Sequence, residues 1–286
     1  MTREIDAVGR TALLAAALRA EETKRPDRLF EDPYAERLAG EIGFELLEVL
    51  HGITYPATGT RTVFSSPDHV GIRTRFFDGF LRHAADMPAT RQVVLGAAGM
   101  DARAYRLEWP ERIRFFEIDR PAVLEYKQNR LEGLRPRVDR RTVPADLVSD
   151  DWEADLEAAG YDPELPSAWL IEGLLYYLPE PEVHRLLDRI AALMAPGSLI
   201  ASDVCNNAAL TCSEWRPMWD MLKDWGCPAL FSCDDPEELF AKHGFDVRAV
   251  LPGDGETAQY NRWDDPVPLP SQAGAPRLYY LHGKRR

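Results

Sequence analysis

Small and acidic residues recur in this sequence directly after short apolar runs, in an order that suits nucleoside binding. Residues 96–99 read Gly-Ala-Ala-Gly after one run, Asp119 ends the next, Asp146 and Leu147 come later, and Glu172 ends another. A turn of small residues lets the backbone approach a cofactor closely, and an acid ending the following strand can accept hydrogen bonds from both hydroxyls of a ribose. Asp146 is then placed to meet an adenine amino group. The pattern predicts a nucleoside-binding site.

The glycine turn discriminates between nucleoside cofactors. A dinucleotide site needs Gly-x-Gly-x-x-Gly, so that the pyrophosphate can rest on a helix N-terminus. Here the third glycine is absent, and Asp101 stands where a diphosphate would lie. A cofactor with a ribose but no phosphate fits better, and the sulfonium of S-adenosylmethionine tolerates acidic neighbours. We expect S-adenosylmethionine, and keep two alternatives open: an NAD-dependent oxidoreductase, and an S-adenosylmethionine-binding protein that transfers no methyl group.

Four short apolar runs are the expected strands that carry these side chains. They are almost continuously apolar, which is typical of strands buried on both faces of a parallel sheet. They cover residues 92–95, 114–119, 168–172 and 198–203. Helical patterns cover residues 121–131, 181–195 and 236–243. This alternation predicts right-handed crossovers and an open, doubly wound α/β sheet, whose ligands bind at the carboxyl ends of the strands.

The composition of the 286 residues is that of a soluble globular protein, with 45% hydrophobic and 28% charged residues. No apolar run is long enough to cross a bilayer, and the net charge of −13 repels nucleic acid and anionic lipid. We therefore expect neither a membrane nor a nucleic acid as partner. Residues 1–6 carry acids and no apolar core of a secretory signal, which predicts a cytoplasmic protein.

The four cysteines lie close together in the sequence, at Cys205, Cys212, Cys227 and Cys233. No pair has the spacing of a zinc knuckle, and no histidine lies between them. We therefore expect free thiols and no metal site.

Several motifs in order make the chain resemble the leucine carboxyl methyltransferase family. The resemblance is to its bacterial branch of S-adenosylmethionine-dependent O-methyltransferases, which includes enzymes of aromatic polyketide tailoring. The motifs are residues 92–107, 116–121 and 171–179, with upstream matches at residues 11–21, 32–35 and 73–78. The resemblance covers residues 8–204, and several ordered motifs are far more specific than any one of them.

The resemblance implies a class I methyltransferase fold, with a mostly parallel, Rossmann-like sheet of seven strands. The cofactor-binding residues it implies are Arg19 and Arg73 at the methionine carboxylate, Gly96, Ala97 and Gly99 in the turn, Asp119 at the ribose, Asp146 and Leu147 at the adenine, and Glu172 near the methionine amino group. A guanidinium suits a carboxylate because it can donate two parallel hydrogen bonds. Glu117 is the alternative residue for the ribose. The family turn usually reads Gly-Ala-Gly, so Ala97 departs from it.

We expect a single methyltransferase domain over residues 1–286. It divides into a helical N-terminal cover (1–90), a cofactor-binding core (91–204), a lid insertion (205–233) and the C-terminal part of the sheet (234–286). A long insertion at the ligand end of a sheet is commonly a lid. The number of subunits is left open.

Aromatic and sulfur-bearing residues near this insertion predict a small apolar acceptor, for which an aromatic, polyketide-like molecule is one candidate. The acceptor-site candidates are Tyr176, Tyr177, Trp215 and Trp219, although the spacing of the tryptophans also fits a packed helical core. The sequence shows no general-base motif, so the catalytic residues stay unassigned. An acceptor that is already an anion needs little acid–base help. We therefore expect O-methylation of a carboxylate or an acidic phenol.

Overall fold

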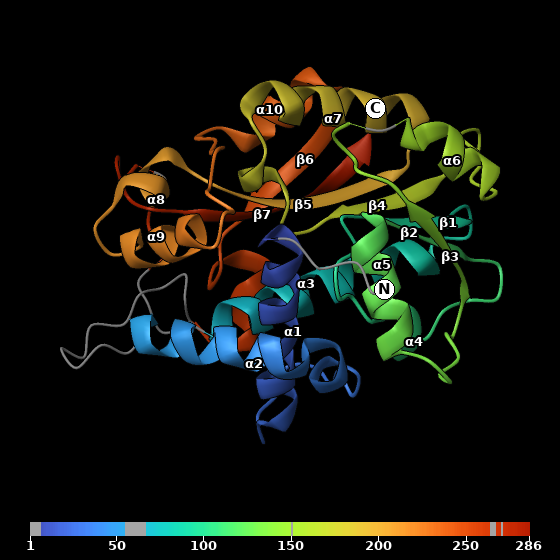
Figure 1. Ribbon diagram of the computed structural model, residues 1–286. Coiled ribbons are helices and arrows are strands. Elements are labelled where there is room, and N and C mark those ends of the chain that lie inside the picture. Colours follow the sequence, from blue (N-terminus) through green and yellow to red (C-terminus); the bar gives the residue numbers. More distant parts are fainter. Residues whose placement is uncertain (1–6, 55–66, 150, 264–266, 270) are drawn as a thin grey trace.

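A seven-stranded sheet forms the centre of the computed structural model, which describes residues 7–54, 67–149, 151–263, 267–269 and 271–286. The strand order is β3-β2-β1-β4-β5-β7-β6, and β7 runs antiparallel to the other strands (Figure 1). The strands are β1 (Gln92–Gly96), β2 (Arg114–Asp119), β3 (Asp139–Pro144), β4 (Ser167–Ile171), β5 (Leu199–Cys205), β6 (Phe245–Val250) and β7 (Leu278–Arg285). The predicted doubly wound, mostly parallel sheet is confirmed.

The burial of each strand explains whether it can be predicted from the sequence. Every residue of β1 and β4 is buried, and β2 and β5 are buried except at their first residue. Strands covered on both faces read as continuous apolar runs. The edge strand β3 instead reads Asp-Arg-Arg-Thr-Val-Pro, with a single buried residue, Val143. Charged residues are common on edge strands because they discourage further pairing, and they hide the strand from a search for apolar runs.

Two hydrophobic cores lie on the two faces of the sheet. One contains residues of α6 (Trp152–Ala158), α7 (Glu180–Leu193) and α10 (Pro236–Lys242), above the sheet in Figure 1. The other contains residues of α4 (Arg103–Arg106), α5 (Pro121–Arg130) and the N-terminal helices. The predicted helix over residues 181–195 is α7, which ends earlier because Met194 is already extended before the Pro-Gly stop at residues 196–197.

Three helices form the N-terminal part of the chain: α1 (Ala7–Lys24), α2 (Ala35–Thr54) and α3 (Pro67–Asp86). They lie below the sheet in Figure 1, where α1 packs against both α2 and α3. Gly40 interrupts α2 with a φ of 59°, a conformation that favours glycine. Helices therefore form the described part of the predicted cover; residues 1–6 and 55–66 lie outside the described residues.

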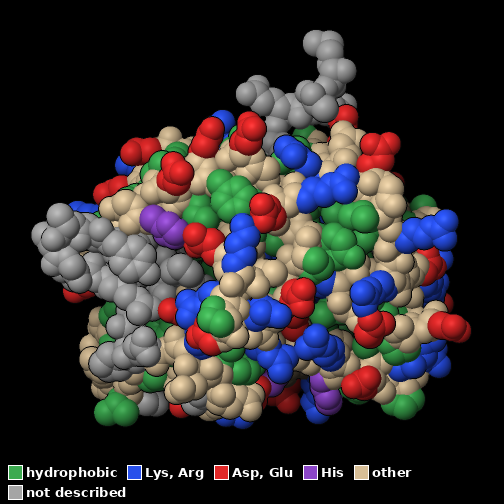
Figure 2. Space-filling model, turned by 90° about the horizontal axis from the view of Figure 1, so that it is seen from below, with side chains coloured by type: hydrophobic (Ala, Val, Ile, Leu, Met, Phe, Trp, Pro, Cys, Tyr) green, Lys and Arg blue, Asp and Glu red, His purple; other side chains and the backbone are tan. Residues whose placement is uncertain are grey.

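The segment predicted as an insertion contains α8 (Asn207–Thr211) and α9 (Arg216–Asp224). Two short 3₁₀ turns, η1 (Leu175–Tyr177) and η2 (Gly255–Tyr260), complete the described elements. None of the described helices is long and apolar enough to cross a membrane. On the face seen in Figure 2, acidic and basic side chains are intermixed.

Candidate functional site

A cavity of about 360 Å³ lies at the carboxyl ends of β1, β2 and β4. Helices α1, α3 and α9 contribute the facing wall. Every residue that the sequence assigned to the cofactor lines this cavity: Arg19, Arg73, Gly96, Ala97, Gly99, Asp119, Asp146, Leu147 and Glu172. The doubly wound fold thus brings together residues that are more than 150 positions apart in the chain, where open α/β sheets bind ligands.

Asp119 ends β2 and is bound to the glycine turn. Its Oδ2 accepts a hydrogen bond from the Gly99 N–H at 2.6 Å, and its Oδ1 accepts one from the Arg120 N–H at 2.7 Å. Burial raises the pKa of the Asp119 carboxyl, and these two hydrogen bonds oppose the rise. The carboxylate is therefore held in one orientation at the cavity wall.

Glu117 lies on the same face of β2 as Asp119, two residues further back from the strand end, and does not reach the cavity. It is fully buried and is not among the cavity residues. Its Oε2 lies 2.8 Å from Lys127 Nζ and 2.7 Å from Arg140 Nη2. Glu117 is therefore part of a buried ion cluster beneath the sheet edge.

The turn after β1 has two residues in the left-handed region. Ala97 has a φ of 56° and Gly99 a φ of 46°. The left-handed conformation costs a residue with a Cβ about 1–2 kcal/mol, so Ala97 is strained at the position where the resemblance implies glycine. At Gly99 an added Cβ would lie 3.0 Å from Ala12 Cβ, because α1 packs directly on the turn. Glycine at position 99 is required by both the conformation and this contact.

Asp146 and Leu147 follow β3 at the far end of the cavity. Asp146 Oδ1 accepts a hydrogen bond from the Val148 N–H at 2.8 Å, which fixes the carboxylate. Leu147 is buried, and its carbonyl accepts a hydrogen bond from Trp152 Nε1 at 3.0 Å. This end therefore pairs an apolar side chain with an oriented hydrogen-bond acceptor, which suits a planar base that carries an amino group.

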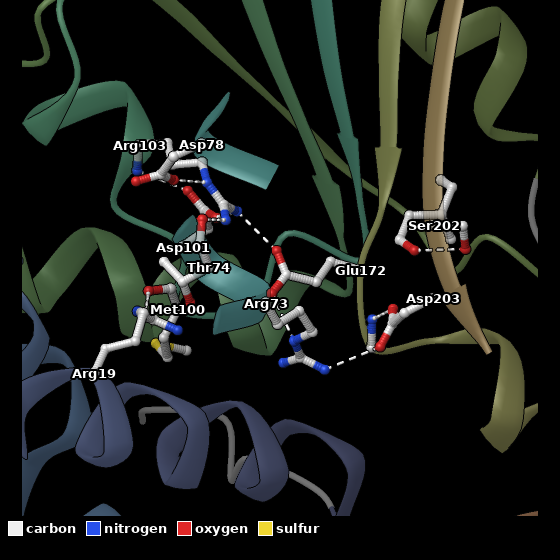
Figure 3. A network of polar contacts seen from close by, with 12 residues as sticks. Arg19, Arg73, Thr74, Asp78, Met100, Asp101, Arg103, Glu172, Ser202 and Asp203 are labelled. Atoms are coloured by element: carbon white, nitrogen blue, oxygen red, sulfur yellow. Dashed lines mark hydrogen bonds and ion pairs between the residues drawn. The ribbon is translucent and has the colours of Figure 1, made fainter. Parts of the chain in front are cut away.

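Arg73, on α3, reaches the opposite end of the cavity. Its Nε lies 2.9 Å from Glu172 Oε1, and its Nη1 donates a hydrogen bond to Asp203 Oδ2 at 3.0 Å (Figure 3). Tyr176 OH lies 3.4 Å from the same Nη1. The guanidinium is nine-tenths buried, so these acids are needed to offset the cost of its desolvation.

Glu172 is shared between two guanidiniums. Its other oxygen, Oε2, lies 2.9 Å from Arg103 Nη1 (Figure 3). Arg103 is almost fully buried and also contacts Asp101 and Asp78, the latter at 2.7 Å. The sequence assigned no role to Arg103, although it lies within the motif over residues 92–107. Of its three acidic partners only Asp101 lies in that motif, so the sequence carried little signal for this role.

Arg19 approaches the cavity from α1. Its Nε donates to Asp32 Oδ2 at 3.0 Å and its Nη2 to the Met100 carbonyl at 2.6 Å (Figure 3). Arg19 therefore connects α1 to the residues after β1. The other α1 residues that line the cavity are mostly apolar or small, and the sequence analysis assigned them no role. They are Gly9, Thr11, Ala12, Leu14, Ala15 and Leu18.

The acceptor-site candidates separate into two groups. Tyr176 and Tyr177 line the cavity, whereas Trp215 and Trp219 are buried and are not among the lining residues. Trp219 Nε1 donates to the Ala209 carbonyl at 2.8 Å, which ties α9 to α8. The lining residues of α9 lie on another face of that helix: Met218, Met221 and Leu222. The tryptophans therefore pack in the core, and methionines occupy the cavity wall.

His69 also lines the cavity and was missed, because its partner is distant in sequence. Its Nδ1 lies 3.0 Å from Tyr280 OH, and that hydroxyl donates to the His69 carbonyl at 3.3 Å. Burial, reinforced by Arg73, lowers the pKa of His69 well below its ordinary value. His69 is therefore a neutral ring that joins α3 to β7.

The cysteines form no disulfide, as predicted. Among the described residues, no group of three or more His, Cys, Asp or Glu side chains is arranged to hold a metal ion.

Known structures share this fold at low sequence identity. A DUF574 family protein of Streptomyces avermitilis superposes with a TM-score of 0.64 at 14% identity, over 96% of this chain and 97% of the other. A "putative methyltransferase" of Thermobifida fusca superposes with a TM-score of 0.60 at 19% identity, over 91% of this chain and 94% of the other. At such identities the likeness concerns the fold alone.

Sequence relatives are much closer. A "Putative S-adenosyl-L-methionine-dependent methyltransferase" of Mycobacterium avium (strain 104) is 46% identical over 204 residues, which are 68% of this chain and just under two thirds (66%) of the relative. A relative of the same name from Saccharopolyspora erythraea is 40% identical over 269 residues, 87% of each chain. A model of the family described as "Leucine carboxyl methyltransferase" matches residues 12–191. The chain belongs to the leucine carboxyl methyltransferase family.

Proposed function

We propose that this protein is an S-adenosylmethionine-dependent methyltransferase that methylates an oxygen atom of a small apolar acceptor, either a carboxylate or an acidic phenol. The methyltransferase class and the cofactor rest on family membership and on the names of the relatives. The observation that supports a cofactor site in this chain is that all nine expected cofactor-binding residues line one cavity.

The residues present fit the cofactor. The end near Arg73 has guanidiniums and carboxylates side by side, which matches an amino acid with one charge of each sign. Arg73 Nε is buried and, among the described residues, has no hydrogen bond of adequate direction, although Glu172 is close. Such an unsatisfied donor is costly in a finished interior and is expected where a ligand completes the network.

Each end of the cavity would hold a different part of the ligand. Asp119 would accept hydrogen bonds from the ribose, and Asp146 with Leu147 would hold the adenine. Arg73 and Arg19 would hold the carboxylate, and Glu172 the amino group. When bound, S-adenosylmethionine supplies an electrophilic methyl group on a sulfonium.

The protein contributes positioning and exclusion of water at the acceptor end. Met218, Met221 and Leu222 on α9 line the same cavity as Leu14 and Leu18 on α1. An apolar wall of this kind favours an apolar acceptor and removes water from around its oxygen, which makes an anionic nucleophile more reactive. A carboxylate or acidic phenol arrives already ionised, so no general base is required.

Ligand binding tests the cofactor assignment first. In calorimetry with the full chain we expect S-adenosylhomocysteine to bind with micromolar affinity and NAD not to bind. Absence of S-adenosylhomocysteine binding at about millimolar concentration, equivalent to only about 4 kcal/mol, contradicts the proposal. Binding of NAD instead would favour the oxidoreductase.

Methyl transfer is tested with methyl-labelled S-adenosylmethionine and a metabolite extract, followed by mass spectrometry of the products. Mild alkali cleaves a methyl ester and releases methanol, whereas an aryl methyl ether survives. Alkali-labile label therefore identifies a carboxylate acceptor, and stable label in an ether identifies a phenol. Label in an N-, S- or C-methyl product contradicts O-methylation while leaving the cofactor assignment intact.

A further inference from the structure

Asp203 is a buried carboxylate behind the cavity to which no function has been assigned above. It lies on β5, its side chain is inaccessible to solvent, and it is not among the lining residues. Burial raises the pKa of its carboxyl, with Arg73 opposing the rise. A carboxylate taken fully out of water is expensive unless it is paired and hydrogen-bonded. Its partners therefore indicate what it does.

The two oxygens of Asp203 have different partners. Oδ2 accepts a hydrogen bond from Arg73 Nη1 at 3.0 Å (Figure 3), and Oδ1 accepts one from the Gly173 N–H at 2.7 Å. Gly173 directly follows Glu172 and has a φ of 71°, a conformation that favours glycine. Asp203 therefore joins β5 both to the guanidinium on α3 and to the turn that carries Glu172.

These contacts fix the orientation of the Arg73 guanidinium. Nη1 is held by Asp203, and Nε lies beside Glu172. Because a guanidinium is planar, the hydrogen bond from Nη1 to Asp203, together with the ion pair between Nε and Glu172, also sets the direction of Nη2. A Cβ on Gly173 would lie 3.6 Å from Nη1 and 3.8 Å from Nη2, so the guanidinium rests against this glycine. Arg73, Glu172 and Gly173 all line the cavity, whereas Asp203 supports them from behind.

We propose that Asp203 is a positioning residue that holds Arg73 and the Gly173 turn in the arrangement that receives the amino-acid end of the cofactor. The inference rests on the proposed function, since its ligand is the S-adenosyl compound. Asp203 itself does not touch the ligand; it acts through Arg73.

A merely structural role for Asp203 would affect all ligands of the cavity alike. 5′-Methylthioadenosine keeps the adenine, the ribose and the thioether of S-adenosylhomocysteine but lacks the carboxylate and the amino group. Loss of a residue that positions Arg73 therefore weakens S-adenosylhomocysteine and leaves 5′-methylthioadenosine unchanged. The pair of ligands separates the two roles without knowledge of the acceptor.

The experiment is calorimetry of both ligands with the full chain and with the Asp203→Asn variant, which keeps the shape and removes the charge. We expect the affinity for S-adenosylhomocysteine to fall about tenfold or more, as for the loss of a hydrogen bond to a charged group, and that for 5′-methylthioadenosine to change less than about twofold. Glu117→Gln is the matched control, since Glu117 is equally buried and paired but lies outside the cavity. It should change neither affinity.

A double-mutant cycle tests whether Asp203 acts through Arg73. In an Arg73→Lys background, Asp203→Asn should weaken S-adenosylhomocysteine much less than it does in the wild type, because the group that it positions is gone. Additive losses would contradict the proposed route.

Equal weakening of both ligands by Asp203→Asn, or unchanged S-adenosylhomocysteine affinity, overturns the proposal. If Asp203→Asn does not fold, Asp203→Glu replaces it: the longer side chain keeps the charge but displaces Arg73, and the same two expectations apply. Failure of the wild type to bind S-adenosylhomocysteine is a different result, because it overturns the proposed function itself.

Discussion

Two acids that are separated by one residue on β2 have opposite environments. Asp119 lines the cavity and accepts hydrogen bonds from two backbone N–H groups. We expect Asp119→Ala to leave the fold intact and to weaken S-adenosylhomocysteine by about 1.5–3 kcal/mol, the usual contribution of hydrogen bonds to a charged group. Calorimetry measures the affinity, and circular dichroism checks the fold.

Glu117→Ala is the comparison on the same strand. It leaves the buried cations of Lys127 and Arg140 without their shared partner, so we expect a loss of about 3–5 kcal/mol in the free energy of unfolding. The affinity of the folded protein should be unchanged. If Glu117→Ala weakens the ligand and Asp119→Ala does not, Glu117 rather than Asp119 binds the ribose.

Arg73 should not tolerate replacement by lysine. Lysine keeps the positive charge but offers a point donor in place of a planar fork, so Arg73→Lys should weaken S-adenosylhomocysteine although the net charge is unchanged. The matched control is Arg75→Lys, because Arg75 stacks over the Tyr260 ring and does not line the cavity. Unchanged affinity in Arg73→Lys, or a larger loss of affinity in Arg75→Lys, would show that Arg73 is not the arginine that binds the carboxylate.

Ala97 is the residue at which the backbone is strained. Replacing it by glycine removes a cost of about 1–2 kcal/mol for the left-handed conformation and adds about 0.4–1 kcal/mol of unfolded-state entropy, so Ala97→Gly should stabilise the protein slightly. Ala98→Gly is the control; Ala98 does not have a positive φ, and its replacement should destabilise. Urea unfolding of both variants compares them, and the same loss in each would show that Ala97 carries no strain.

At the scale of elements, the sequence predicts buried strands and the site residues that directly follow them. The Gly-Ala-Ala-Gly turn and Asp119 are recognisable because each follows an apolar strand that is covered on both faces. Arg103 and His69 are not, because their partners Asp78 and Tyr280 come from other elements. On α9, composition identified aromatic residues, but the direction of each side chain depends on how the helix packs, and this puts Met221 rather than Trp219 at the cavity.

The reactivity of the cysteines can be used to measure how often the segment that contains α8 and α9 opens. Burial raises the pKa of Cys205 to about 12, and its side chain is inaccessible, whereas Cys212 is half-buried. Because the thiolate is the reactive form, Cys212 should be alkylated in the native protein and Cys205 only on global unfolding. Cys227, buried directly after α9, should react at the rate at which α9 opens, and S-adenosylhomocysteine should slow it if this segment is a lid.

Mass spectrometry of iodoacetamide-treated protein, with and without ligand, measures the rate at each cysteine. Modification of Cys205 as fast as that of Cys212 would contradict its burial. Modification of Cys227 that the ligand leaves unchanged would contradict a lid role for residues 205–233.

Across the whole molecule, buried ion pairs attach the N-terminal helices to the rest of the chain. Asp78 on α3 lies 2.7 Å from Arg103 and 2.6 Å from Arg106, both on α4. Arg262, near the C-terminal end, contacts Glu22 on α1 at 2.8 Å and Asp68 on α3 at 2.7 Å. Buried pairs add little net stability over apolar packing, but removing one partner leaves an uncompensated charge. The attachment of these helices should therefore depend on the ionisation of their acids.

Asp78 makes this dependence measurable. Burial would raise the pKa of its carboxyl, but Arg106 and Arg103 dominate and lower it from 3.8 to about 2. Since the folded state holds the proton less tightly than the unfolded state, the stabilisation is fully present above the unfolded pKa and is lost as the pH falls through the folded pKa. It corresponds to about 2 kcal/mol. Acidification from about pH 4 to about pH 2 should therefore remove it.

The Asp78→Asn variant isolates this contribution. Urea unfolding should show it less stable than the wild type by about 3–5 kcal/mol near neutral pH, because two buried guanidiniums lose their shared carboxylate. The difference between the two proteins should narrow as the pH is lowered below about 4, since the wild type then loses the same charge. Asp27→Asn removes an exposed acid whose closest ion pair is with the surface residue Arg25, and it should leave stability nearly unchanged at each pH. A wild-type advantage over Asp78→Asn that stays constant down to about pH 3 would show that the carboxylate charge does not hold α3 to α4, and that packing alone attaches the N-terminal helices to the sheet.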